Sequence, residues 1–176
     1  MNRRQKTLQQ LTLFALLTTF AAILSYLDAL LPLQFLPLPG LKLGLANLVV
    51  LLSLYLLPPH FAALVSLLRI LLIHLLLFPS PNGLILSLCG AFLSFFAMLL
   101  FKKMRFPIIS VSIFGSICHN VGQTLAAVLL LKTPALFVCL AWLLPLGALC
   151  GALIGLLAAI LIGRAKRILQ KDPPKS

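Results

Sequence analysis

The sequence predicts an all-α integral membrane protein, one bundle of about six transmembrane helices with both chain ends on the cytoplasmic side. Hydrophobic residues make up 62% of its 176 residues, charged residues make up only 9%, and the mean hydropathy is +1.17. A soluble domain contains roughly 45–50% apolar residues. Pro, Gly and charged residues divide the chain into apolar runs of the length that a bilayer requires. We therefore expect a single transmembrane domain over 1–176.

The predicted spans follow this punctuation in order. The first follows a basic N-terminus and is longer than the roughly 7–15-residue apolar region of a signal peptide, so we expect it to be retained. A proline-rich connection, Pro32 to Gly40, precedes the second span, and Pro58-Pro59 forms an inner turn after it. The cluster from Pro79 to Gly83 forms an outer turn before the fourth span. The six predicted spans are 8–31, 41–57, 60–78, 84–101, 107–131 and 135–163.

The orientation follows from the basic residues, because cytoplasmic loops of membrane proteins carry an excess of Lys and Arg. Eleven of the 14 basic residues lie at the predicted inner ends: Arg3, Arg4, Lys6, Lys102, Lys103, Arg105, Arg164, Lys166, Arg167, Lys171 and Lys175. The same bias explains the net charge of +12, so we do not expect nucleic-acid binding. We expect a multi-pass protein of the inner or plasma membrane, with membrane lipids as its surroundings.

Polar side chains inside the spans are the candidate ligand-binding residues, because a charged group at the centre of a membrane helix costs about 2.5–3.5 kcal/mol. Arg69 lies near the middle of the third span, and His119, Asn120 and Gln123 lie on a polar stripe of the fifth. Hydrogen bonds between helices are the alternative explanation of that stripe.

Two further residues, Lys42 and Asn47, lie at the start of the second span and complete the predicted site at its outer mouth. Asp28 is a candidate ion-pair partner for Lys42, and His74 is expected to serve as a structural hydrogen-bonding group. Because two of the predicted site residues are cations, a small anionic or polar ligand from outside is the simplest guest.

Small residues at four-residue spacing form two lines that permit close helix approach. In the sixth span Gly147, Gly151 and Gly155 are expected to serve helix packing, with docking of a partner protein as the alternative. The first span carries a shorter line, Ala21, Ser25 and Ala29, with the same two interpretations.

The sequence offers no catalytic set. It has no paired carboxylates, no Asp-rich metal motif and no metal-ligand spacing among its four cysteines. We therefore favour a noncatalytic protein without metal or cofactor.

Three blocks carry a family resemblance: Pro39-Gly40-x-Lys42-Leu43-Gly44-x-Ala46-Asn47; Arg69 with Ser80-Pro81 and Leu86-Ser87-Leu88-x-Gly90; and His119-Asn120-x-Gly122-Gln123. Through them nearly the whole chain resembles a bacterial family labelled heptaprenyl diphosphate synthase component I or Gx transporter. That family is distantly similar to the substrate-binding S components of energy-coupling-factor (ECF) vitamin transporters. This implies a six-helix bundle whose partners are a membrane subunit and ATPases, with Ala21, Ser25 and Ala29 docking the membrane subunit.

Two functions remain open. The leading hypothesis is a membrane substrate-binding subunit that captures a small anionic or polar compound from the outer side. The alternative, implied by the other family label, is a noncatalytic membrane component associated with heptaprenyl diphosphate or menaquinone biosynthesis.

Overall fold

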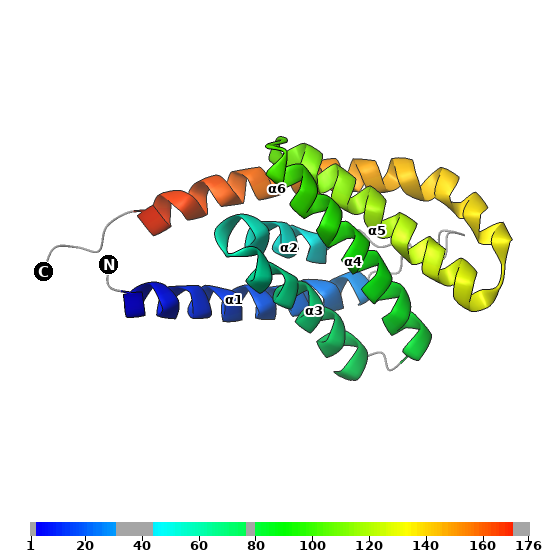
Figure 1. Ribbon diagram of the computed structural model, residues 1–176, viewed down its shortest axis with the longest axis horizontal. Coiled ribbons are helices and arrows are strands. Elements are labelled where there is room, and N and C mark those ends of the chain that lie inside the picture. The colour runs from blue at the N-terminus through cyan, green and yellow to red at the C-terminus, as the bar shows by residue number, and fades with distance from the viewer. Residues whose placement is uncertain (1–2, 31–43, 77–79, 171–176) are drawn as a thin grey trace, which may run out of the picture.

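The computed structural model describes residues 3–30, 44–76 and 80–170, which form six α-helices and one short 3-10 helix (Figure 1). The elements are α1 (Arg3–Leu30), α2 (Leu45–Leu56), α3 (Pro59–Leu76), α4 (Pro81–Lys103), α5 (Ile108–Leu131), η2 (Pro134–Cys139) and α6 (Leu140–Gln170). The first turn of α1 and the last turn of α6 lie at the same end of the molecule (Figure 1). The predicted all-α bundle is confirmed.

Five helical segments are long and apolar enough to cross a membrane. They are α1, α3, α4, α5 and the continuous stretch of η2 and α6. Their outer surfaces carry large apolar side chains, such as Leu75 and Leu129, which are 79% and 72% exposed. In water such a surface would be costly, whereas lipid chains solvate it. The chain is therefore a multi-pass membrane protein.

The second span differs from its prediction. We expected a span over 41–57, but residues 41–43 lie outside the described ranges and α2 has only 12 residues. A helix of that length rises about 18 Å, less than the roughly 30 Å of a hydrocarbon core. Every residue from Ala46 to Leu54 is buried. Protein rather than lipid surrounds this helix, which explains why its sequence is apolar on all sides.

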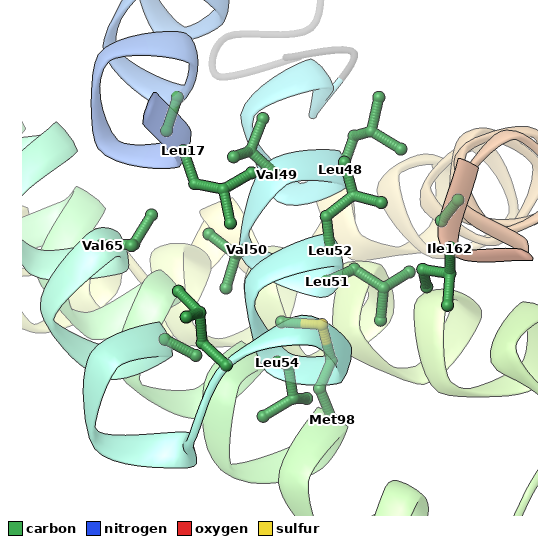
Figure 2. Packing of buried hydrophobic residues seen from close by; sticks show 14 of the residues in the cluster. Leu17, Leu48, Val49, Val50, Leu51, Leu52, Leu54, Val65, Met98 and Ile162 are labelled. Carbon is green, nitrogen blue, oxygen red and sulfur yellow. The ribbon is translucent and has the colours of Figure 1, made fainter. Parts of the chain in front are cut away.

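The hydrophobic core is built around α2. Its leucine and valine side chains reach Leu17 of α1, Val65 of α3, Met98 of α4 and Ile162 of α6 (Figure 2). The short helix thus holds the longer ones around it.

A lysine binds the C-terminal end of α2, where the last carbonyl groups of a helix lack partners within the helix. The ammonium group of Lys102 donates a hydrogen bond to Leu54 O and lies 4.9 Å from the centre of the Tyr55 ring. Lys102 and Lys166 are near enough to repel one another. The basic ends of α4 and α6 therefore lie on the same side of the bundle, as the orientation predicted from charge requires.

Glycines bring α4, α5 and α6 close together. A Cβ atom on Gly122 of α5 would lie 2.7 Å from Cys89 O of α4. On α6, a Cβ atom would lie 2.9 Å from Ile113 Cα at Gly151, and 2.8 Å from Ile109 Cα at Gly155. Real Cβ atoms do not approach backbone so closely, so these contacts require glycine.

Candidate functional site

A small polar cavity lies where five helices meet. Its volume is about 40 Å³, and α1, α2, α3, α5 and α6 all contribute to its walls. The lining residues are Asp28, Gly44, Ala46, Asn47, Arg69, Ser116, His119, Asn120, Gly147 and Cys150. Four of the predicted ligand-binding residues, Asn47, Arg69, His119 and Asn120, therefore meet at one place.

Arg69 is the central cation of this cavity. Its side chain is only 8% exposed, and its two terminal nitrogens donate to Asn47 Oδ1 and to Ser25 Oγ, each across 3.4 Å. The third nitrogen, Nε, is buried and has no hydrogen-bond partner within the part of the chain that the structure describes. Because five N–H groups of a guanidinium seek acceptors, the site still offers a buried donor.

Asp28 gives the same cavity a negative charge. Its Oδ2 accepts a hydrogen bond from Ala46 N, in the first turn of α2, across 3.3 Å. The N-terminus of a helix carries a partial positive charge, so this contact stabilises the carboxylate. Asp28 and Arg69 also attract one another electrostatically. The expected partner Lys42 lies outside the described residues. Asp28 also lines the cavity with Arg69, a role that sequence analysis did not assign to it.

The turn before α2 places these groups. Gly44 has φ 75°, in the left-handed region that other residues rarely adopt, and its carbonyl accepts from Asn47 N across 2.8 Å. This turn directs Asn47 and Ala46 N toward the cavity. A glycine followed by a polar residue at the start of an apolar run is the sequence signal for the arrangement.

A second cavity of about 180 Å³ adjoins the first. It is lined by His74, Gly83, Leu86, Ser87, Asn120, Gln123, Thr124, Ala127, Leu136, Cys139 and Leu143. Asn120 lines both cavities, whereas Gln123 lines only this one. The predicted set of polar residues is thus divided between two adjoining cavities.

Hydrogen bonds fix the polar side chains of the second cavity. His74 Nδ1 donates to Ile70 O across 2.9 Å, which leaves Nε2 to accept from the Ser87 hydroxyl at 3.5 Å. Asn120 Nδ2 donates to Leu143 O across 2.7 Å. The structural role expected of His74 agrees with this bond, although the residue also lines a cavity.

Gly90 makes room for two of the site residues. A Cβ atom there would lie 2.6 Å from Gln123 Cγ and 3.1 Å from His119 Cε1. Any larger residue at position 90 would force the Gln123 side chain to shift and would press against His119.

The small residues of α1 face the interior. Ala21 is fully buried and Ser25 accepts from Arg69, while the side chain of Ala29 lies outside the described set. A partner helix could contact Ala21 only if α1 moved, whereas Ser25 is half-buried. The small residues of α6, Gly147, Gly151 and Gly155, all face side chains or backbone of α5.

Within the described ranges, no group of three or more His, Cys, Asp or Glu side chains is placed to hold a metal ion. The chemistry that the two cavities support is recognition by hydrogen bonds and charge.

Comparisons with known proteins agree with this architecture. A family model described as heptaprenyl diphosphate synthase component I matches residues 17–161. Among solved structures, the chain is similar to the S component of a bacterial ECF transporter, with a TM-score of 0.70 and 18% sequence identity. The alignment covers 94% of this chain and 99% of that one. No curated protein matches the sequence. The predicted S-component-like fold is confirmed.

Proposed function

Because the chain belongs to the heptaprenyl diphosphate synthase component I family and has the fold of an S component, we propose that it is a membrane substrate-binding subunit for transport. It would capture a small anionic or polar compound from the outer side of the inner or plasma membrane. The observation that carries this proposal is the convergence of Asp28, Asn47, Arg69 and Asn120 on one cavity.

Two features favour binding over simple helix–helix hydrogen bonding. Polar residues that only tie helices together satisfy one another, whereas Arg69 retains a buried Nε–H without an acceptor among the described residues. The polar groups also line space rather than close it, since the two adjoining cavities measure about 40 and 180 Å³. Pockets with a few convergent polar groups are the usual form of small-molecule sites.

Transport would require partners. The sequence has no glycine-rich loop with a lysine to cradle phosphates, so energy would come from ATPases acting through a separate ECF-type membrane subunit. Co-purification of this chain with such subunits from its own cells would support the assignment.

The name of the family favours a second function, a noncatalytic role in heptaprenyl diphosphate or menaquinone metabolism. In that case the cavities would hold the head of a prenyl compound rather than a transported solute.

The experiment is mass spectrometry of small molecules that co-purify with the protein in detergent. We expect a bound compound that is lost from Arg69→Gln and retained by Lys132→Gln, which removes an exposed cation that lines neither cavity. Equal occupancy of Arg69→Gln and the wild type would reject Arg69 as a ligand contact. A prenyl compound in place of a polar solute would favour the second function.

A further inference from the structure

We infer that the bound compound is an amphiphile from the membrane, with its polar head in the larger cavity and a single acyl chain in a groove between α3 and α4. This inference rests on the proposed binding function and specifies the class of compound. The compound would then enter sideways from the lipid rather than directly from water.

An apolar groove of about 410 Å³ lies between the last turns of α3 and the start of α4. Its lining residues are Leu71, His74, Leu75, Ser80, Pro81 and Leu84. Both helices are long and apolar enough to cross a membrane, and Leu71 and Leu75 are exposed on their surface. The groove therefore opens to the hydrocarbon of the bilayer.

A second groove, of about 130 Å³, lies between the same two helices. Its walls include, three from each helix, Ala63, Leu67, Ile70, Leu88, Phe92 and Phe95. Steps of three and four residues place these side chains on the same helical faces as the lining of the first groove. From Ala63 to Leu75, α3 rises about 18 Å, more than half of the roughly 30 Å of a hydrocarbon core. The two grooves together have the length of one chain that extends through one leaflet.

His74 connects the first groove with the larger cavity, because it lines both. Its Nδ1 bonds to Ile70 O, and its Nε2 lies 3.5 Å from the hydroxyl oxygen of Ser87. Ser87 and Gln123 also line the cavity. An amphiphile that lies across His74 would therefore have polar side chains around its head and apolar walls along its chain.

The bilayer determines how such a compound is held. Acyl chains already surround α3 and α4, so a chain that moves from lipid into the groove gains little from the hydrophobic effect. Binding must come from van der Waals contacts along the groove together with hydrogen bonds to the head. A head without a chain, or a chain without its groove, should therefore bind much more weakly than the whole amphiphile.

The test uses Cys139, a half-buried thiol that lines the larger cavity, as its reporter. In the whole chain in detergent, with Cys89, Cys118 and Cys150 replaced by serine, the rate of reaction with methyl methanethiosulfonate is measured. Hexadecanoate has one acyl chain and a carboxylate head, and it should slow the reaction at least roughly fivefold. Butanoate has the same head on a short chain and should protect much less. A chain that keeps only Cys89, which is exposed and lines neither the cavity nor the grooves, should show no protection.

Matched variants separate the groove from the detergent, which concentrates any long chain. Leu71→Trp fills the groove, whereas Leu125→Trp adds the same ring at a similarly exposed position of α5 that lines none of these spaces. Protection by hexadecanoate should fall at least roughly threefold in Leu71→Trp and stay unchanged in Leu125→Trp. His74→Phe keeps a ring between groove and cavity but removes both nitrogens, and it should lose protection as well.

The outcomes separate the inference from the proposed function. Equal protection by butanoate and hexadecanoate, or equal protection in Leu71→Trp and Leu125→Trp, would overturn the role of the groove while leaving binding in the cavity in place. Protection by farnesoate, a branched prenyl chain with the same head, but not by hexadecanoate would assign the groove to a prenyl compound and overturn the acyl chain.

If no probe protects Cys139, the compound that co-purifies with the protein decides. A compound with an acyl chain supports the inference, and a compound without one overturns it. If no compound co-purifies either, the proposed function fails together with the inference.

Discussion

A Cβ atom on Gly147 would overlap the side-chain amide nitrogen of Asn120. That nitrogen donates to Leu143 O, one turn earlier on α6, across 2.7 Å. Asn120 lines both the small polar cavity and the larger one. Because Gly147 has no side chain, Asn120 has room to take this position. A feature of helix packing thereby becomes a condition for the site.

Gly147→Ala should therefore weaken ligand binding. The added methyl group must push the Asn120 amide away from Leu143 O or force α5 and α6 apart. Overpacking of this kind costs about 1–3 kcal/mol, and loss of the hydrogen bond adds to it. We expect a lower unfolding temperature and reduced occupancy by the co-purified compound.

The matched control is Gly163→Ala, on the same helix, where an added Cβ atom meets nothing within 4 Å. It should leave both quantities unchanged or raise the stability slightly, since Ala favours helix over Gly. Equal effects at the two glycines would show that helix propensity, rather than the contact with Asn120, determines the result.

Asp28 and Arg69 should depend on one another for stability. Arg69→Leu removes a cation that attracts the buried carboxylate of Asp28, so this variant should have a lower free energy of unfolding. Asp28→Asn in the same chain should recover part of that loss, because the carboxylate that Arg69 attracts is then absent. Reversible unfolding in mixed detergent micelles measures the free energy of each variant.

The double variant should still fail to bind the co-purified compound, because the guanidinium is absent. Recovered stability without recovered binding separates the role of Arg69 in the fold from its role at the site. Strictly additive losses of stability would contradict the coupling between the two residues.

The sequence predicted the fold because lipid constrains helical spans more strongly than water constrains a soluble fold. It could not predict that α2 is a short buried helix, since a run such as Leu48–Leu54 is apolar whether protein or lipid surrounds it. Gly44, with its positive φ, begins that helix later than the apolar pattern suggested.

The site was predictable in part for a similar reason. Arg69, Asn47 and Asn120 stood out because polar groups at membrane depth require partners. Their partners did not stand out. Ser25, which we expected to dock a partner helix, accepts from Arg69 because of the rotation of α1 about its axis, and single-sequence patterns do not determine that rotation.

Lys102 should contribute to stability in a way that its neighbour does not. It donates to the C-terminal end of α2 at Leu54 O and lies over the Tyr55 ring, whereas Lys103 is exposed. Lys102→Met should lower the free energy of unfolding by about 1–2 kcal/mol, through loss of a charge-assisted bond at the end of a buried helix.

Lys103→Met is the control and should change stability by less than about 0.5 kcal/mol, as exposed substitutions usually do. Both variants remove one positive charge from the same end of α4. A similar loss in the two would assign the effect to charge at the membrane surface instead of to the contact with α2.

The orientation of the chain can be tested at two exposed lysines that we expect on opposite sides of the membrane. Lys132 follows α5 and should face outward, and Lys103 ends α4 and should face the cytoplasm. In a background without the four native cysteines, Lys132→Cys should react with a membrane-impermeant maleimide on intact cells, whereas Lys103→Cys should react only after permeabilisation. This result would place the part of the larger cavity that Gly83 and Leu136 line toward the exterior. The reverse labelling pattern would turn the site to face the cytoplasm, and capture of a compound from outside would then be untenable.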